Sequence, residues 1–192
     1  IVHFDPKTGL SKHYYNKRSY ELEQMNESVR SVFFDSKGQL WTGSWGSGLR
    51  KYNRQSDNFE SIIFTNDSTF NQINDIIEDE TGLFWIAVDA ALICYNPTDG
   101  KYMIYRNYEN DLYSYSSYPG TCLFKDNNQG IWIGTLSKSG LYYFNRRQKF
   151  TSSHVLPNAV EPINRNHRTS YFHEDSVGNI FVGNDVSMHL WN

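Results

Sequence analysis

The chain has 192 residues and a formal net charge of −3, with 39% hydrophobic and 16% aromatic residues. This aromatic content excludes a disordered chain, and the scattered lysines and arginines form no basic block of the kind that binds nucleic acid. Its 2 cysteines are too few for a disulfide scaffold, and the longest apolar stretch, residues 83–95, is interrupted by Asp89 and shorter than a membrane span of about 18 residues.

One motif recurs four times along the chain. In each copy an aspartate stands six residues before an aromatic residue, and a small residue follows two positions later. The aspartates lie 44, 47 and 49 residues apart. The four copies are Asp35–Trp41–Gly43, Asp79–Trp85–Ala87, Asp126–Trp132–Gly134 and Asp175–Phe181–Gly183. This spacing indicates a structural repeat of about 45 residues.

Each repeat predicts four short strands and almost no helix, because no window shows a 3.6-residue apolar period. An Asp-x-x-Gly turn joins the first two strands, in which the aspartate caps backbone N–H groups and glycine supplies a positive φ. The third copy, Asp126 to Gly130, is interpreted as carrying one inserted residue. An aromatic residue followed by Asn or Asp marks the end of each third strand, at Phe4-Asp5, Tyr52-Asn53, Tyr95-Asn96, Phe144-Asn145 and Trp191-Asn192.

Four antiparallel strands per repeat are typical of a β-propeller blade. We therefore expect an all-β, partial β-propeller of about four four-stranded antiparallel blades, open or closed by dimerisation, in a single domain over residues 1–192. The expected repeat units are 1–22 (partial), 23–65, 66–106, 107–154 and 155–192 (partial). The recurrent Trp41, Trp85, Trp132 and Phe181 are predicted to pack between neighbouring blades. Because the pattern begins and ends within a third strand, we expect a segment of a longer protein that self-associates through its open faces.

Residues 35–53, with Trp45-Gly46-Ser47-Gly48-Leu49 inside them, resemble the two-component regulator propeller repeat, and the resemblance extends over essentially the whole chain. That family supplies the periplasmic sensor regions of hybrid two-component systems, many of which sense oligosaccharides. The resemblance implies a periplasmic location, as the extracytoplasmic part of an inner-membrane protein whose parent chain is a histidine kinase. The second repeat departs from the pattern, with Asp89-Ala90-Ala91-Leu92 where the first has its glycine-rich loop.

Signatures of catalysis are missing from the sequence. The six histidines show no metal-ligand spacing, and neither a nucleophile elbow nor a phosphate-binding loop occurs. A glycosidase would need two carboxylates facing each other across a cleft, which spacing alone neither promotes nor excludes. We expect no catalytic residue, no metal and no cofactor, and we expect Cys94 and Cys122 to be buried free thiols.

Binding is better supported than catalysis. The residue five positions before each repeated aspartate is polar among apolar neighbours: these residues are Arg30, Asn74, Thr121 and Ser170. At the start of the first strand of each blade they would form either a hydrated channel wall or a ring of groups that orients a polar ligand. Trp45 has no counterpart in the other repeats, so it either stacks on a sugar or contacts a neighbouring subunit.

Two long connections add candidate recognition residues. Residues 107–118 carry four tyrosines, including Tyr118, and residues 151–168 include Arg165, His167 and Arg168, which would favour an acidic or sulfated ligand. Ordinary propeller insertions are the alternative for both. The candidate ligand-binding residues are Trp45, Arg30, Asn74, Tyr118 and Arg168.

The leading hypothesis is a non-catalytic, extracytoplasmic sensor segment that binds an oligosaccharide and signals to a kinase. It would contact no nucleic acid, and it would reach the membrane only through other parts of the parent chain. The alternatives are a propeller enzyme, either a polysaccharide lyase or a glycosidase, and an architectural propeller for protein–protein contact.

Overall fold

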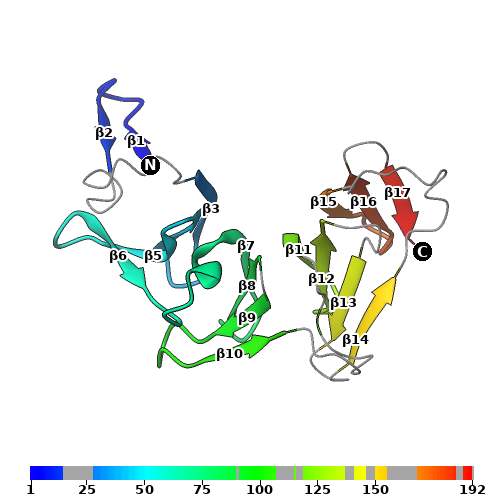
Figure 1. Cartoon of the computed structure of the whole chain (residues 1–192). Coiled ribbons are helices and arrows are strands. Elements are labelled where there is room, and N and C mark those ends of the chain that lie inside the picture. The colour runs from blue at the N-terminus through cyan, green and yellow to red at the C-terminus, as the bar shows by residue number, and fades with distance from the viewer. Residues whose placement is uncertain are drawn as a thin grey trace. The chain divides into compact units, whose positions relative to one another are not determined.

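The computed structural model describes residues 1–14, 28–89, 91–106, 115, 119–136, 141–145, 150–154, 168–184 and 188–191 (Figure 1). Two compact units make up the chain, Ile1–Ile73 and Asn74–Asn192, and they are described separately. Strand β7 begins at Ile73, the last residue of the first unit, and continues into the second.

The first unit holds a hairpin, one complete four-stranded sheet and a short 3₁₀ helix. The hairpin consists of β1 (Val2–Phe4) and β2 (Ser11–His13), which pair antiparallel. The sheet has the order β3-β4-β5-β6, with β3 (Ser28–Phe34), β4 (Leu40–Trp45), β5 (Gly48–Asn53) and β6 (Asn58–Ile62). The 3₁₀ helix η1 spans Ser68–Asn71.

The second unit holds three sheets in which strands consecutive in sequence are neighbours. The first sheet contains β7 (Ile73–Glu78), β8 (Phe84–Val88), β9 (Ala91–Tyr95) and β10 (Tyr102–Tyr105). The second contains β11 (Gly120–Lys125), β12 (Ile131–Thr135), β13 (Leu141–Asn145) and β14 (Phe150–His154). The third contains β15 (Thr169–Glu174), β16 (Ile180–Asn184) and β17 (Met188–Trp191). The all-β, partial β-propeller expected from the repeat is confirmed, and each sheet is one blade.

The repeated aspartate closes the turn between the first two strands of each blade. In the second blade, one carboxylate oxygen of Asp79 accepts hydrogen bonds from the backbone N–H groups of Thr81 (2.8 Å) and Leu83 (3.1 Å). The other oxygen accepts from the indole Nε1 of Trp85 at 2.9 Å. Asp35 and Asp126 bind Trp41 and Trp132 in the same way, at 2.9 and 2.8 Å. The six-residue spacing therefore reflects one carboxylate that fixes both the turn and the orientation of the buried ring.

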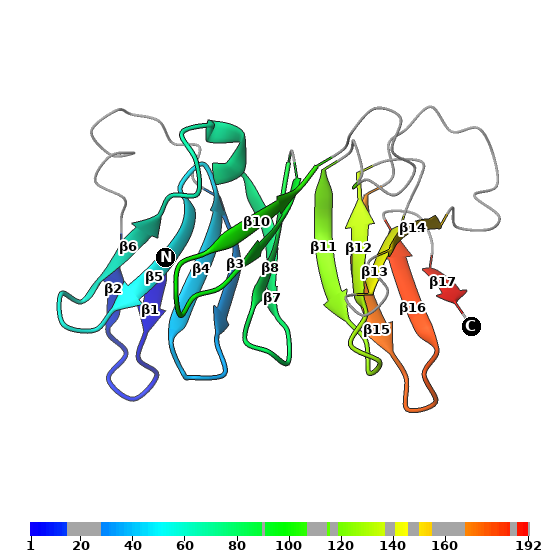
Figure 2. The same ribbon diagram turned by 90° about the horizontal axis from the view of Figure 1, so that it is seen from below.

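The fourth blade achieves the same closure without an indole. Its aromatic residue, Phe181, has no N–H group, and the side chain of Asn179 donates to Asp175 Oδ2 at 2.7 Å instead. The backbone N–H groups of Val177 and Asn179 still donate to Asp175 Oδ1, each at 2.9 Å. Within the second unit, the turns β7–β8, β11–β12 and β15–β16 lie at the same side of the sheets (Figure 2).

The interpretation that the third turn carries an inserted residue is wrong. Asp126 and Trp132 keep the six-residue spacing, and Gln129 occupies the position that is glycine in the other turns, with φ +66°. The corresponding φ values are +72° at Gly38 and +78° at Gly82. Glycine stands one residue later, at Gly130, because a Cβ atom there would lie 2.2 Å from the Tyr143 ring.

The recurrent tryptophans of the second unit pack between blades, as predicted. Trp85 of β8 is buried together with residues of its own blade, of the following blade and of the connection between them: Ala87, Leu92, Tyr115, Leu123, Ile131, Ile133 and Phe144. The Trp85 and Phe144 ring centroids are 4.9 Å apart. Trp132 of β12 packs likewise with Ile180 and Val182 of the following blade. Trp41 is buried in the first unit, whereas Phe181 is only half-buried.

The ionisation of Asp79 makes the stability of the second unit depend on pH. Burial raises the pKa of the Asp79 carboxyl, but hydrogen bonds from Thr81, Trp85 and Leu83 together lower it by more than burial raises it. The pKa of Asp79 therefore lies below its usual value. A depressed carboxyl pKa stabilises the folded state above the unfolded value of about 4, and this stabilisation is lost as the pH falls below that value. We expect the urea midpoint to fall less steeply for Asp79→Asn than for the unsubstituted chain when the pH is lowered from about 5 to about 3. Identical pH profiles would contradict this role of the carboxylate.

Candidate functional site

Three of the four polar positions singled out in the sequence lie at β-bulges. The strand register steps from Val29 to Ser31 in β3, from Gly120 to Cys122 in β11 and from Thr169 to Tyr171 in β15. The residues at these register steps are Arg30, Thr121 and Ser170. A bulge redirects a side chain from the regular alternation of a strand, so each first strand presents one polar residue outside the apolar pattern.

Asn74 connects three segments of the second unit. Its side-chain Nδ2 donates to the carbonyl of Gly120 in β11 at 2.9 Å and to Asp89 Oδ1, after β8, at 2.9 Å. Nearby, Asp75 Oδ2 accepts from the backbone N–H of Leu123 at 2.8 Å. Both donor hydrogens of the Asn74 amide are therefore used inside the protein, and its carbonyl oxygen is the group suited to a ligand donor.

Thr121 and Cys122 hold β11 to β15. The Thr121 hydroxyl is buried and can donate to the carbonyl of Thr169 or, at 3.2 Å, to that of Gly134. The Cys122 thiol lies 3.2 Å from the same Thr169 carbonyl, and burial raises the pKa of the thiol to about 12. Cys122 is thus a buried free thiol as expected, while Cys94 is free but only half-buried. Thr121 is a packing residue of this junction.

Ser170 and Arg168 are more accessible than Thr121. Ser170 is exposed, and its hydroxyl donates to the Arg168 carbonyl at 3.3 Å. Arg168 is half-buried and forms an isolated β-bridge with Leu136, which follows β12. The structure therefore places Ser170 and Arg168 close together at the start of β15. A serine hydroxyl can donate to and accept from a ligand hydroxyl group, whereas an arginine guanidinium only donates and favours an anionic ligand.

Trp45 and Arg30 lie in the first unit, near the same end of β3 and β4. Trp45 is the last residue of β4 and pairs with Ser28, two residues before the exposed Arg30. The turn after Trp45 is anchored to the segment around η1, because Trp45 bridges Gln72 and Gly46 N donates to the Asn71 carbonyl at 2.9 Å. Trp45 is half-buried, and the turn that follows it is held in place by these contacts.

Tyr118 lies outside the described residues, as do Arg165 and His167. From the tyrosine-rich connection the structure describes Tyr115, which is buried in the Trp85 cluster with its ring 6.0 Å from that of Tyr142. Burial raises the pKa of the Tyr115 phenol. This tyrosine therefore belongs to the core, and it was not separable by sequence from the tyrosines around it.

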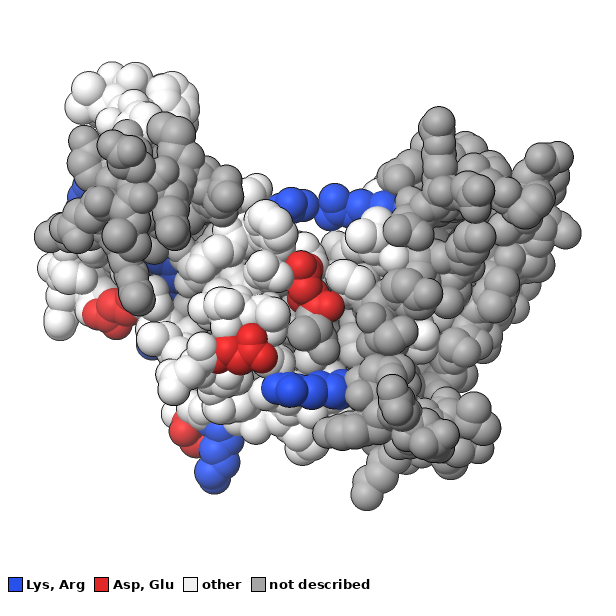
Figure 3. All heavy atoms as spheres, viewed as in Figure 1, with Lys and Arg blue, Asp and Glu red and all other residues white. Residues whose placement is uncertain are grey.

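Among the residues that the structure describes, no group of three or more His, Cys, Asp or Glu side chains is arranged to hold a metal ion. No helix in this part of the chain is long and apolar enough to cross a membrane. The described lysine, arginine, aspartate and glutamate side chains visible in Figure 3 are dispersed over that face and not gathered by charge.

Comparison with known structures identifies the fold. The structure superimposes on the extracellular domain of the hybrid two-component system BT4673 from B. thetaiotaomicron with a TM-score of 0.76 and 19% identity, over 98% of this chain and 24% of that chain. For the extracellular domain of BT3049 from the same organism the TM-score is 0.68 and the identity 21%, over 95% of this chain and 24% of that chain. The chain shares the fold of these extracellular domains. It spans about a quarter of their length.

An enzyme also shares the fold. Virginiamycin B lyase from Staphylococcus aureus superimposes with a TM-score of 0.73 and 8% identity, over 100% of this chain and 62% of that chain. No family model matches the sequence, and no curated protein matches it.

Proposed function

We propose that the chain is an extracytoplasmic, ligand-sensing propeller segment of a hybrid two-component sensor. In this proposal it binds an oligosaccharide in the periplasm without transforming it, needs no cofactor and signals to a histidine kinase elsewhere in the parent protein. The observation that carries the proposal is the fold shared with the extracellular domains of BT4673 and BT3049 over nearly the whole chain.

The chemistry at the blade ends supports a sugar ligand. An oligosaccharide presents many hydroxyl groups and, on the faces of its rings, C–H groups that stack on aromatic side chains. Asn74, Ser170 and Arg168 supply hydrogen-bonding groups in the second unit, and Trp45 with Arg30 supplies a ring and a charge in the first. Arg168 favours a carboxylated or sulfated sugar over a neutral one.

Signalling requires that the ligand favour one of two arrangements. A ligand shifts such an equilibrium only by its difference in affinity for the two states. We propose that these states differ in how copies of the chain self-associate, so ligand binding changes the arrangement that the kinase experiences.

Titration calorimetry with neutral and sulfated oligosaccharides tests the proposal. We expect saturable binding with no product in chromatography of the ligand, and a roughly tenfold weaker Kd for Arg168→Ala, which corresponds to about 1.4 kcal/mol. Ser170→Ala is expected to weaken binding less, because it removes one neutral hydrogen bond. Lys101→Ala, an exposed change in the β9–β10 turn, is the control that leaves the Kd unchanged.

Two results would replace this function with another. Product formation would support a lyase or glycosidase, in line with the fold shared with virginiamycin B lyase. Failure of every oligosaccharide to bind would support an architectural propeller. An unchanged Kd for both Arg168→Ala and Trp45→Ala would show that neither residue binds the ligand.

A further inference from the structure

Of the three turns between third and fourth strands that the structure describes, one has an aspartate where the other two have glycine. Each turn starts with Asp or Asn, whose side chain accepts the N–H two residues later, at 2.9 Å for Asp5, 2.8 Å for Asn53 and 2.9 Å for Asn96. Four residues after each start the backbone φ is positive: +71° at Gly9, +49° at Asp57 and +74° at Gly100. A side chain is disfavoured in this conformation, so Asp57 occupies a position that glycine would fill at lower cost.

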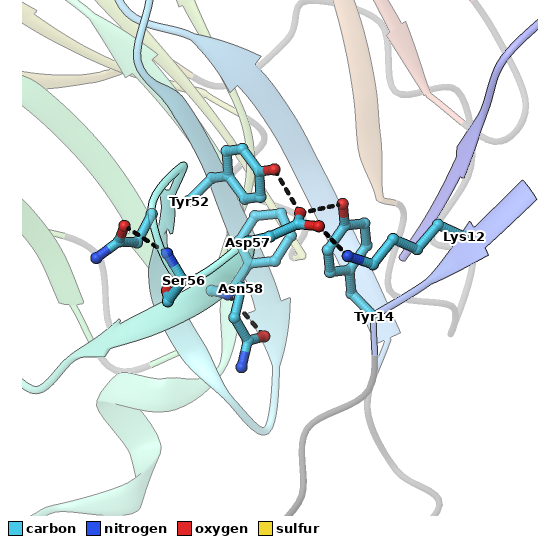
Figure 4. Close-up of polar contacts among 8 residues, drawn as sticks. Lys12, Tyr14, Tyr52, Ser56, Asp57 and Asn58 are labelled. Carbon is cyan, nitrogen blue, oxygen red and sulfur yellow. Dashed lines mark hydrogen bonds and ion pairs between the residues drawn. The ribbon is translucent and has the colours of Figure 1, made fainter.

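The carboxylate of Asp57 receives three donors from two parts of the first unit. Lys12 Nζ forms an ion pair with Oδ2, and Oδ1 accepts from the hydroxyls of Tyr14 at 2.9 Å and Tyr52 at 2.6 Å (Figure 4). Lys12 lies in β2, Tyr14 directly follows that strand, and Tyr52 lies in β5 of the neighbouring sheet. A single side chain therefore links the hairpin to the sheet.

The rings around the carboxylate pack as a small aromatic cluster. The Tyr14 ring meets Phe59 edge-on at 5.4 Å and Tyr52 at 6.0 Å, and Lys12 Nζ lies 4.9 Å from the centre of the Tyr14 ring. The side chains of Lys12 and Asp57 are 50% and 47% exposed. Hydrogen bonds from Lys12, Tyr52 and Tyr14 hold the pKa of Asp57 below its usual range, so the carboxylate is charged. A half-exposed, charged link is easier to open than a buried apolar one.

We propose that Asp57 is a latch that holds the hairpin β1–β2 against the sheet β3–β6 and whose opening frees the hairpin from that sheet. In the second unit, adjoining blades are joined through the buried apolar clusters of Trp85 and Trp132, together with hydrogen bonds such as that from Asn74 to the Gly120 carbonyl. The hairpin junction instead has a charged, half-exposed centre among the rings of Tyr14, Tyr52 and Phe59, and the unfavourable backbone of Asp57 is retained for that link. This inference goes beyond the proposed sensing function and does not depend on it.

Amide hydrogen exchange on the Asp57→Gly chain tests the latch. Glycine suits the positive φ, so the turn and the sheet are expected to fold at least as well as before. We expect the hairpin amides of Asp5 and Gly9 to exchange about tenfold faster or more, because three contacts to a charged group are lost. Amides of β4 and β5 are expected to exchange at unchanged rates.

Two further variants separate the latch from a role in the turn. The double change Tyr14→Phe with Tyr52→Phe keeps the rings and the turn but removes two donors, and it is expected to raise hairpin exchange by less than Asp57→Gly. Asp99→Asn, in the equivalent turn of the second unit, is the matched control and should leave the hairpin unchanged, because Asp99 bonds to Lys101 within its own turn. Unchanged hairpin exchange in Asp57→Gly would overturn the latch, and so would an equal rise in β4 and β5.

Discussion

Replacing Trp85 with alanine is expected to lower the free energy of unfolding by about 3–5 kcal/mol. The indole is 1% exposed, lies between two blades and donates to Asp79. Its removal leaves a cavity in the cluster around it and takes one hydrogen-bond donor from the Asp79 carboxylate. Urea denaturation followed by circular dichroism measures the loss, and a change below about 1 kcal/mol would contradict the inter-blade role.

The fourth blade suggests a second substitution that should restore part of the stability lost on changing Trp85. Trp85→Phe keeps a ring but removes the N–H donor, so we expect a smaller loss of about 1–3 kcal/mol. In the fourth blade, Asn179 gives Asp175 the donor that Phe181 lacks, and Leu83 holds the equivalent position in the second blade. Adding Leu83→Asn to Trp85→Phe should therefore restore part of the loss, while Leu83→Asn alone should not stabilise the chain. Strict additivity of the two changes would show that the carboxylate does not couple these positions.

Replacing Gly134 with alanine is expected to cost about 1–3 kcal/mol, although alanine is a minimal change. A Cβ atom at this position would lie 2.6 Å from Thr169 Cβ and 2.7 Å from Cys122 Sγ, which are closer than packed atoms approach. The strands β11, β12 and β15 meet here, so a shift of one would disturb the hydrogen bond between Thr121 and Thr169. The equivalent residue of the second blade, Ala87, is fully buried, so a methyl group fits at that position.

The midpoint of urea denaturation of Gly134→Ala again provides the measurement. Ser170→Ala, an exposed change in the strand that Gly134 contacts, is the control and should alter the free energy of unfolding by less than about 0.5 kcal/mol. Equal midpoints for the two variants would show that the junction between β12 and β15 accommodates a methyl group at position 134 without loss of stability.

The repeat made the blade predictable because its determinants are local. A turn of fixed length places Asp79 and Trp85 on neighbouring strands, so their spacing in sequence carries their contact in space. The third turn was misread because Gln129 adopts a conformation that its side chain disfavours. The unchanged spacing from Asp126 to Trp132 was the signal that no residue had been inserted.

The site was less predictable because its geometry depends on contacts between blades. The polarity of Asn74 was visible in the sequence, but its two bonds to Gly120 and Asp89 depend on how neighbouring strands approach each other. Asp57 was missed altogether, although one signal was present. Counting from Asn53 and from Asn96 places Asp57 opposite Gly100, and an acidic residue at a glycine position indicates a specific contact.

The carboxylate that ties each turn to its ring has a consequence for divergence. In each blade the aspartate, the turn residue with positive φ and the recurrent aromatic residue fix the geometry of the first turn. The surface residues can therefore change while the fold of the blade is kept. Low sequence identity with a preserved backbone, as in the comparisons above, is therefore expected when so few positions fix each blade. The ligand specificity of such a propeller can accordingly change through substitutions in one connecting segment at a time, without a change in the fold of the blades.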